Sequence, residues 1–162
     1  MDDVTPAVTM LEAAGIVFTT SEYDRHLSGD GDLRDFGVEA AEALGLSTDE
    51  VFKTLVVVSE TDELVVAVAP VSCQLSMKHV AAAIGAKKVA MCDPTVAERS
   101  SGYVVGGISP LGQRRRLRTV IDESAELFDT IYVSGGRRGF DIGLAPADLV
   151  AVLDAAVAPI TA

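Results

Sequence analysis

The chain has 162 residues, of which 49% are hydrophobic and 23% are charged. These values fit a single domain over residues 1–162 with a sizeable core, and they exclude a disordered, a collagen-like or a coiled-coil chain. The net charge of −11 argues against non-specific binding to DNA or long RNA, because the phosphate backbone would be repelled. A compact contact with one end of an RNA stays open, provided that the basic residues cluster.

The sequence also predicts where the protein resides. Its start, Met1 to Thr5, is acidic where a signal peptide would be basic. The longest apolar runs, such as Val65–Ala69, are far shorter than the roughly 20 residues that span a bilayer. The two cysteines, Cys73 and Cys92, are too few for a disulfide framework and too far apart for a metal knuckle. We therefore expect a cytoplasmic protein that has no membrane partner.

The first part of the chain predicts a helix followed by a strand. Thr5 and Pro6 suit the cap and the first position of a helix, and Gly15 suits its end. Residues 16–23 alternate like a strand, whereas residues 24–36, rich in Asp, Arg and Gly, predict an exposed loop.

A second helix is expected over residues 37–44, closed by Gly45. Residues 47–50, Ser-Thr-Asp-Glu, have the spacing of a capping box. They predict a short helical turn that presents Phe52 and Lys53.

A hairpin follows, because two β-branched apolar runs, 55–58 and 64–69, flank the polar residues 60–63. Three later helices are expected: over 76–84, from Asp93-Pro94 onward, and from Ala145-Pro146 to Leu153. Strands are expected over 89–91, 119–121, 131–133 and around 140–144. Between them the sequence predicts an irregular segment over 104–112 and a turn at Gly135-Gly136. Interleaved helices and hairpin-connected strands favour a mixed sheet with helices packed on it over a purely parallel sheet.

Two glycine-rich stretches are candidates for a site. Gly106–Gly112, Gly-Gly-Ile-Ser-Pro-Leu-Gly, lets the backbone approach a ligand and exposes amides that can polarise a carbonyl or hold an oxyanion. A tight surface turn is the alternative, and neither a Walker loop nor a dinucleotide loop fits. The second stretch, Ser134–Gly139, is either a hairpin turn or a second wall of the same cleft.

Basic residues give two further candidates. Lys53 either snorkels from the edge of a core strand or lies at a cleft floor, where it would hold a phosphate or a polarised carbonyl. Arg114, Arg115, Arg116 and Arg118 gather four of the 13 basic residues beside the first glycine-rich stretch. They form either a solvated turn or a contact for an RNA end.

The sequence predicts neither a metal site nor a protein nucleophile. His26 and His79 have no Cys or acid at ligand spacing, and Cys73 and Cys92 have no nearby His to activate them. Nothing indicates a Ser-His-Asp triad. These residues alone therefore predict a glycine-lined cleft with one lysine and a basic edge, without a cofactor, and they name no substrate.

Five segments, in order along nearly the whole chain, carry a resemblance to a known family: Thr5–Val8, Val51–Leu55, Gly85–Val89, Gly102–Gly112 and Ile131–Gly139. With them the chain resembles the YbaK/EbsC family of aminoacyl-tRNA deacylases, which are relatives of the editing domain of bacterial prolyl-tRNA synthetases. The resemblance implies a mixed sheet, curved like a barrel, with helices around it. It also implies trans-editing hydrolysis of Cys-tRNA(Pro), in which the thiol of the substrate attacks its own ester.

The resemblance also assigns residues. Lys53 matches the key site lysine, and Gly106 belongs to a loop facing the aminoacyl ester. Further substrate-binding residues are implied at Gly107, Ile108, Ser109 and Pro110 of that loop and at Tyr23, Ser134, Gly135 and Asp141.

The expected partner is the acceptor end of a misacylated tRNA, with Arg114, Arg115 and Arg116 as tRNA-binding residues. Prolyl-tRNA synthetase and elongation factor Tu stay open as partners. The acidic loop Asp24–Asp35 departs from the family pattern, which leaves the local substrate contacts there open.

Two alternatives stay open at this point. A sibling enzyme would deacylate Ala-tRNA(Pro) or another small misacylated tRNA, and the size of the pocket would discriminate between the two substrates. A non-catalytic module would bind tRNA or a synthetase through the arginine edge, although the presence of Lys53 beside both glycine-rich stretches argues against this.

Overall fold

The strands of the computed structural model, which describes residues 4–23 and 36–162, form two sheets. The three-stranded antiparallel sheet has the order β1 (Phe18–Glu22), β7 (Phe140–Leu144) and β6 (Ile131–Arg137). The five-stranded sheet has the order β4 (Val89–Met91), β2 (Phe52–Ser59), β3 (Leu64–Pro70), β5 (Arg118–Asp122) and β8 (Ala156–Ala158). In the second sheet β4, β2 and β3 are antiparallel, whereas β5 and β8 are added in parallel.

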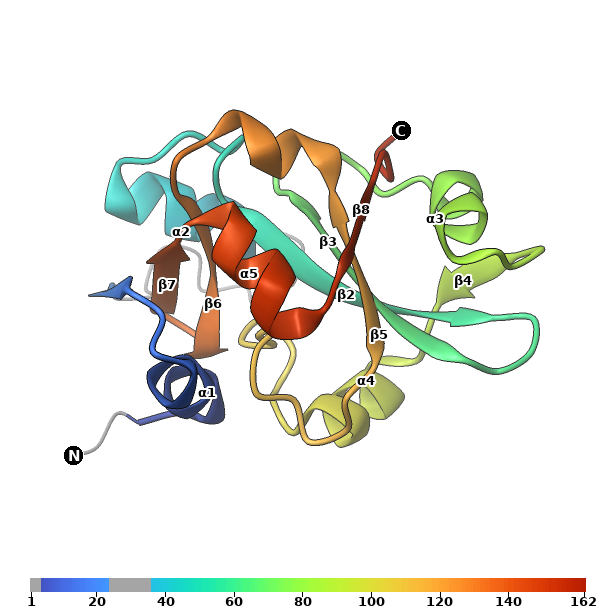
Figure 1. Ribbon diagram of the computed structural model, residues 1–162, viewed down its shortest axis with the longest axis horizontal. Coiled ribbons are helices and arrows are strands. Elements are labelled where there is room, and N and C mark those ends of the chain that lie inside the picture. The colour runs from blue at the N-terminus through green and yellow to red at the C-terminus, as the bar shows by residue number, and fades with distance from the viewer. Residues whose placement is uncertain (1–3, 24–35) are drawn as a thin grey trace.

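The two sheets are joined at one corner. Val51, just before β2, forms a parallel bridge with Tyr132 of β6, and the Tyr132 N–H donates to the Glu50 carbonyl at 3.0 Å. The expected mixed arrangement of strands and helices is therefore confirmed, but the sheet does not close into a barrel. Figure 1 shows the smaller sheet beside the larger one.

The helices are α1 (Pro6–Ala14), α2 (Phe36–Leu44), α3 (Met77–Ile84), α4 (Pro94–Ser101) and α5 (Pro146–Leu153), with a 3₁₀ turn η2 (Glu123–Leu127) after β5. The cap expected at Thr5 is present in α1, and α3 and α4 have side-chain caps of the same kind. Thr5, Ser76 and Asp93 each accept a hydrogen bond from a backbone N–H of the first turn. No helix in the described part of the chain is long and apolar enough to cross a membrane.

Strand β3 is the centre of the core because both of its faces are buried. Val66 and Val68 point into a cluster with α1, α5 and the three-stranded sheet. Val65 and Ala67 alternate to the opposite face and pack in a cluster with α3, β4 and β5. This sandwiched position explains the continuous apolar sequence of the strand.

Four details differ from the sequence expectations. Phe36 begins α2 and is 9% exposed, instead of closing a loop; the rest of the expected loop, 24–35, lies outside the described residues. Gly135 and Gly136 lie inside β6 at a register shift, and the turn comes at 138–139. Residues 47–50 form a hydrogen-bonded turn, with Lys53 inside β2 instead of before it. Neither η2 nor β8 was expected.

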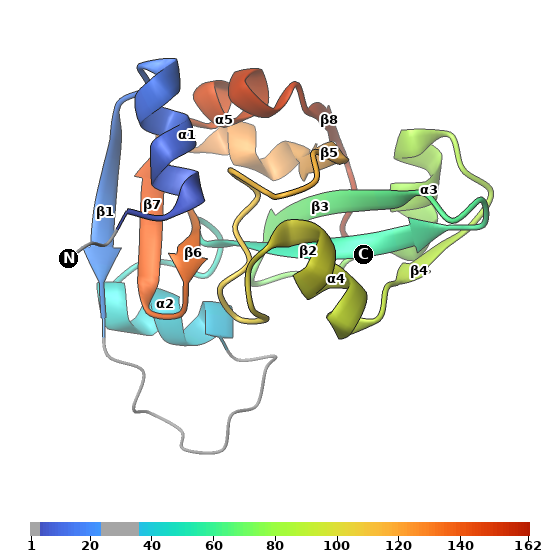
Figure 2. The same ribbon diagram turned by 90° about the horizontal axis from the view of Figure 1, so that it is seen from below.

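The feature of the fold that matters most for a site is an open strand edge. Strand β3 pairs with β2 from Phe52 to Val58, but β4 reaches only Val57 to Ser59 on the other side. Among the residues that the structure describes, the edge of β2 over 52–55 therefore has no strand neighbour. Figure 2 shows α4 passing in front of this part of the sheet.

Candidate functional site

A cavity of about 430 Å³ opens at the free edge of β2. Its walls come from β2, α2, α4, the segment 105–108, β4 and the neighbouring strands β6 and β7. The lining residues are Tyr23, Phe36, Gly37, Ala40, Val51, Phe52, Lys53, Thr54, Leu55, Val56, Val71, Met91, Cys92, Pro94, Ala97, Val105, Gly106, Ile108, Ser134 and Asp141. This is the size of a small-ligand pocket, and the lining is mostly apolar with a few polar groups.

The two glycine-rich stretches meet at this cavity. A Cβ atom on Gly107 would lie 2.8 Å from the Arg137 Cα and 2.9 Å from the Arg138 nitrogen, so only glycine allows this approach of the two backbones. The expectation that the two stretches share one cleft is confirmed, because Gly106 and Ser134 both line the cavity.

Gly106 is constrained by its conformation and by a neighbour. Its φ of +90° lies in the region that favours glycine, and a Cβ atom there would come 2.6 Å from the ring of Phe36. The Phe36 ring thus occupies the space that a side chain would need. The glycine backbone is left facing the cavity between Phe36 and Ile108.

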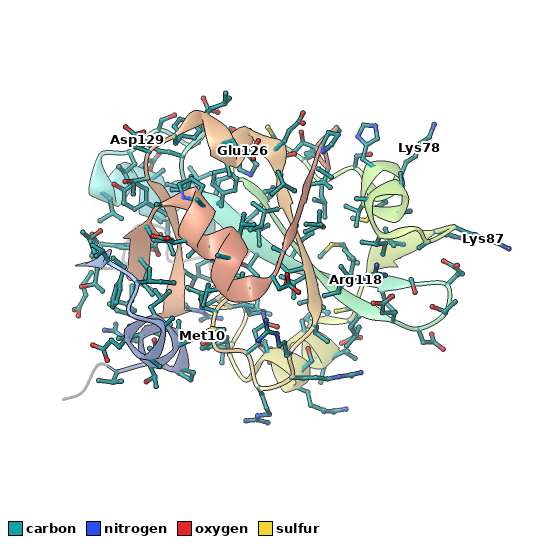
Figure 3. All side chains as sticks on the ribbon, in the orientation of Figure 1. Met10, Lys78, Lys87, Arg118, Glu126 and Asp129 are labelled. Carbon is teal, nitrogen blue, oxygen red and sulfur yellow. The ribbon has the colours of Figure 1, made fainter. Side chains whose placement is uncertain are left out.

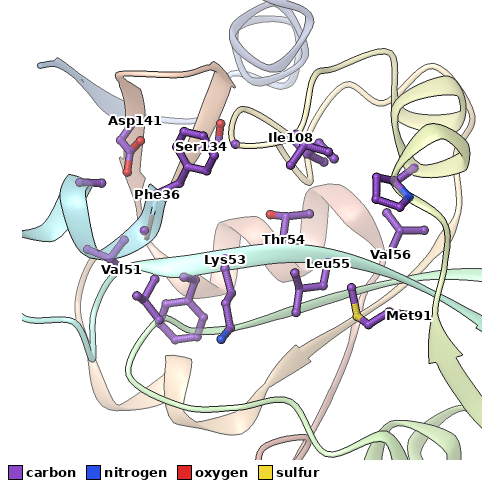
Figure 4. A pocket seen from close by; sticks show the side chains of 18 of the residues that line it. Phe36, Val51, Lys53, Thr54, Leu55, Val56, Met91, Ile108, Ser134 and Asp141 are labelled. Atoms are coloured by element: carbon purple, nitrogen blue, oxygen red, sulfur yellow. The ribbon is translucent and has the colours of Figure 1, made fainter. Parts of the chain in front are cut away.

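Lys53 lines the cavity from β2 and is held by the backbone. Its ammonium donates to the Cys73 carbonyl at 2.6 Å, and burial lowers the pKa of the lysine below its usual range, with a smaller opposing effect from the Cys73 side chain. Figure 4 shows Lys53 and Thr54 leaving β2 on opposite faces, with the Thr54 hydroxyl on the side of Ser134 and Ile108. The lysine and the glycine loop therefore form different walls of the same cavity.

Asp141 is a nearly buried carboxyl group on the wall formed by the smaller sheet. It is 6% exposed, pairs in register with Ser134 across β6 and β7, and lines the cavity. Burial raises the pKa of Asp141 to about 7. Near neutral pH the group can therefore exist in either protonation state.

Asp141→Asn should stabilise the protein at pH 8 and leave its stability nearly unchanged at pH 4. An unfolded Asp has a pKa near 3.9, so between this value and about 7 the folded state retains a proton that the unfolded state releases. The stability given by the neutral carboxyl is complete below pH 4 and is lost as the pH rises through 7. At 1.36 kcal/mol per pKa unit, we expect a gain of about 2–4 kcal/mol at pH 8 in urea unfolding. Equal effects of the substitution at both pH values would contradict this explanation.

Four of the residues assigned to substrate binding by resemblance are buried and are not among the cavity-lining residues: Gly107, Ser109, Pro110 and Gly135. Ser109 shapes the loop from inside, since its hydroxyl accepts from the Leu111 N–H at 3.2 Å and its carbonyl from Gln113 at 2.9 Å. The Gly135 carbonyl accepts a hydrogen bond from the Thr5 hydroxyl at 2.5 Å. Tyr23, Gly106, Ile108, Ser134 and Asp141 do line the cavity, together with Lys53.

The arginine edge lies next to the helix that borders the cavity. The backbone N–H groups of Arg114 and Arg115 donate to the last-turn carbonyls of α4, and the side chains of Arg114, Arg115 and Arg116 are exposed. Arg118 is different, because it forms a salt bridge with Glu63 at 2.8 Å.

Several lining residues were not singled out from the sequence. Phe36, Val71 and Met91 are apolar residues whose role depends on contacts distant in sequence.

Cys92, expected to be an inert thiol, lines the cavity. Burial, and then the charge of Asp93, raises the pKa of the Cys92 thiol, which disfavours the reactive thiolate.

Comparisons with known proteins give the family context. Residues 30–152 match the model of the aminoacyl-tRNA editing domain. The chain is 35% identical over 160 residues, 97% of this chain and 93% of the relative, to the Enterococcus faecalis protein named "Putative Cys-tRNA(Pro)/Cys-tRNA(Cys) deacylase EbsC".

Solved structures show the same fold. The structure described as hypothetical protein APE2540 matches with a TM-score of 0.86 at 23% identity, covering 98% of this chain and all of that one. Another, described as a "putative trans-editing enzyme for prolyl tRNA synthetase", matches with a TM-score of 0.80 at 21% identity and covers 99% of both chains. The chain therefore belongs to the aminoacyl-tRNA editing domain family, in its YbaK/EbsC branch.

Proposed function

We propose that this protein deacylates Cys-tRNA(Pro) in trans, and so removes cysteine that was attached to the tRNA for proline. The observation that carries the proposal is the cavity between Lys53 and the Gly106 loop, in a chain 35% identical over nearly its whole length to the E. faecalis protein named for this activity. The cavity is large enough for a small aminoacyl ester and part of a terminal nucleoside.

The proposed chemistry uses the thiol of the substrate. Its sulfur attacks the ester carbonyl, a C–S bond forms, the C–O bond to the ribose breaks, and the ribose oxygen takes up the thiol proton. The product is a cyclic thiolactone, which water then opens to cysteine. The protein contributes position, together with the Gly106 N–H as a donor to the developing oxyanion.

Lys53 has a different task in this proposal. Its ammonium lies across β2 from Thr54 and the Gly106 loop, so one substrate contacts both walls with different parts. The aminoacyl ester faces the glycine loop, and the terminal adenosine, with its phosphate or ribose, faces Lys53. The ammonium would exchange its bond with the Cys73 carbonyl for this contact.

The proposal is tested by deacylation of Cys-tRNA(Pro), Cys-tRNA(Cys), Ala-tRNA(Pro) and Pro-tRNA(Pro) side by side. We expect release from Cys-tRNA(Pro) and none from Pro-tRNA(Pro).

The double variant Cys73→Ser, Cys92→Ser should retain this activity, since neither thiol is a nucleophile in the mechanism. A folded but inactive double variant would refute the substrate-thiol mechanism. Faster release from Ala-tRNA(Pro) would favour the sibling enzyme.

We also propose that Arg114, Arg115 and Arg116 bind the acceptor end of the tRNA. Reversing all three to Glu should raise KM and make its salt dependence shallower, while kcat stays within a few-fold of wild type. The matched control reverses Lys78, Lys87 and Lys88, which changes the net charge equally. Figure 3 shows Lys78 and Lys87 pointing outward beside α3 and β4, away from α4. Equal effects in both triple variants would assign the change to net charge alone.

A further inference from the structure

The residue that precedes Gly106 is fixed by two charged side chains. The Val105 N–H donates to the Glu98 carboxylate of α4 at 2.8 Å. The Val105 carbonyl accepts from the Arg138 Nε at 2.9 Å, and Arg138 belongs to the turn between β6 and β7. Two elements distant in sequence thus hold one residue of the glycine loop. Hydrogen bonds to charged groups are the stronger kind in proteins.

Arg138 is itself held by an aromatic ring. Its guanidinium carbon lies 4.9 Å from the centroid of the Phe36 ring, in cation–π geometry. The same ring packs against Gly106, where a Cβ atom would lie 2.6 Å away. The Arg138 side chain, although exposed, therefore has a defined place beside the peptide that it contacts.

Because Arg138 fixes the Val105 carbonyl, it also fixes the direction of the Gly106 N–H in the same peptide. The Val105–Gly106 peptide bond is trans, so its C=O and N–H point in opposite directions. With the carbonyl directed at Arg138, the Gly106 N–H points away from the arginine. Within the part of the chain that the structure describes, this N–H makes no hydrogen bond, and Gly106 lines the cavity. A charged donor on the carbonyl also polarises the peptide and strengthens its N–H as a donor.

We propose that Arg138, together with Glu98, positions the Val105–Gly106 peptide so that the Gly106 N–H donates to the oxyanion of the reaction. This inference rests on the proposed function and adds positioning residues that do not contact the substrate themselves. The proposal also explains why a second glycine follows, since Gly107 lets the loop approach the backbone that carries Arg138.

The kinetic test compares Arg138→Met with Arg137→Met in single-turnover deacylation of Cys-tRNA(Pro). Methionine keeps an apolar side chain of similar length but removes the charge and the Nε donor. Arg137 is a matched control, because its guanidinium lies over Phe140 and pairs with Glu22, outside the cavity lining. We expect Arg138→Met to lower the saturating rate about 10- to 100-fold, with the half-saturating concentration changed less than about threefold, because removing an oxyanion donor outright costs about 10²–10³. Arg137→Met should stay within about twofold of wild type.

Glu98→Gln should give a smaller loss of the saturating rate, because the amide can still accept from Val105 with a weaker hydrogen bond. If Arg138→Met raises only the half-saturating concentration and leaves the saturating rate unchanged, the proposal is overturned and Arg138 is a tRNA contact. Equal losses in Arg137→Met and Arg138→Met would overturn it as well.

A second measurement does not depend on activity. Val105–Gly106 is the only Val-Gly pair in the sequence, so labelling Val with ¹³C at the carbonyl and Gly with ¹⁵N gives one correlated NMR peak for this peptide. In Arg138→Met the Val105 carbonyl should shift upfield through loss of its hydrogen bond, and the Gly106 amide should become less ordered. In Arg137→Met the peak should stay in place.

An unmoved peak in Arg138→Met would overturn the positioning role whatever the enzyme does. A shifted peak in a protein that deacylates no misacylated tRNA would instead retain the positioning of the peptide and reject the proposed function.

Discussion

Cys-tRNA(Pro) should be deacylated more than about 200-fold faster than Ala-tRNA(Pro) or Ser-tRNA(Pro), with a cyclic thiolactone as its first product. A pocket that distinguishes substrates only by the fit of a small side chain reaches about 10–200-fold. Alanine enters any cavity that accepts cysteine but has no nucleophile. The hydroxyl of serine has nearly the same size as the thiol, but it ionises far less readily than a thiol of pKa about 8.5.

The measurement is single-turnover deacylation of the three substrates with the early products trapped and separated. A thiolactone formed before free cysteine would support attack by the substrate thiol. Similar rates for cysteine and alanine, with free amino acid as the direct product, would indicate an activated water. The Gly106 loop would then hold this water beside the ester, and a deacylase for Ala-tRNA(Pro) would become the better description.

Lys53→Ala should lose most of the activity, on the order of a hundredfold or more, while the protein stays folded. Removing a charge-assisted hydrogen bond from the transition state costs about 2–3 kcal/mol. The fold should tolerate the change, because the lysine is only partly buried and its partner in the structure is one backbone carbonyl. Deacylation rates and thermal unfolding, measured on the same preparation, separate the two effects.

Two further variants sharpen this experiment. Lys53→Met keeps the apolar stem and should be nearly as inactive as alanine if the charge is what matters. Lys78→Ala removes an exposed lysine from α3 and should leave the rate unchanged. Near-normal deacylation by a folded Lys53→Met protein would exclude a role for the ammonium and leave only the packing of its stem.

The sequence predicted local structure well, because local structure depends on neighbours. Thr5, Ser76 and Asp93 cap their helices through side-chain contacts within three residues, so their signals are visible in short windows. The hairpin of β2 and β3 was equally visible. Strand β8 was missed because a three-residue strand has little pattern of its own and depends on pairing with β5.

The site was predictable in part for the same reason. The glycine content of the loop and the resemblance of the chain pointed to Gly106 and Lys53. They could not reveal that Phe36 fills the space beside Gly106, or that Arg138 reaches Val105, since these contacts join residues far apart in the chain. They also could not separate the cavity-lining Ile108 from the buried Ser109 that supports the loop from within.

The open edge of β2 also bears on the solubility of the protein. An unpaired edge of an apolar strand invites another strand to add to it, which is a common start of aggregation. The sequence of β2 changes from apolar to polar beyond the point where its neighbour β4 ends. Val57 and Val58 lie between β3 and β4, whereas Lys53 and Thr54 lie where β4 no longer reaches. A partly buried ammonium at such an edge opposes the docking of a second chain. The lysine that we propose contacts the substrate thus also disfavours the addition of a second copy at the cavity.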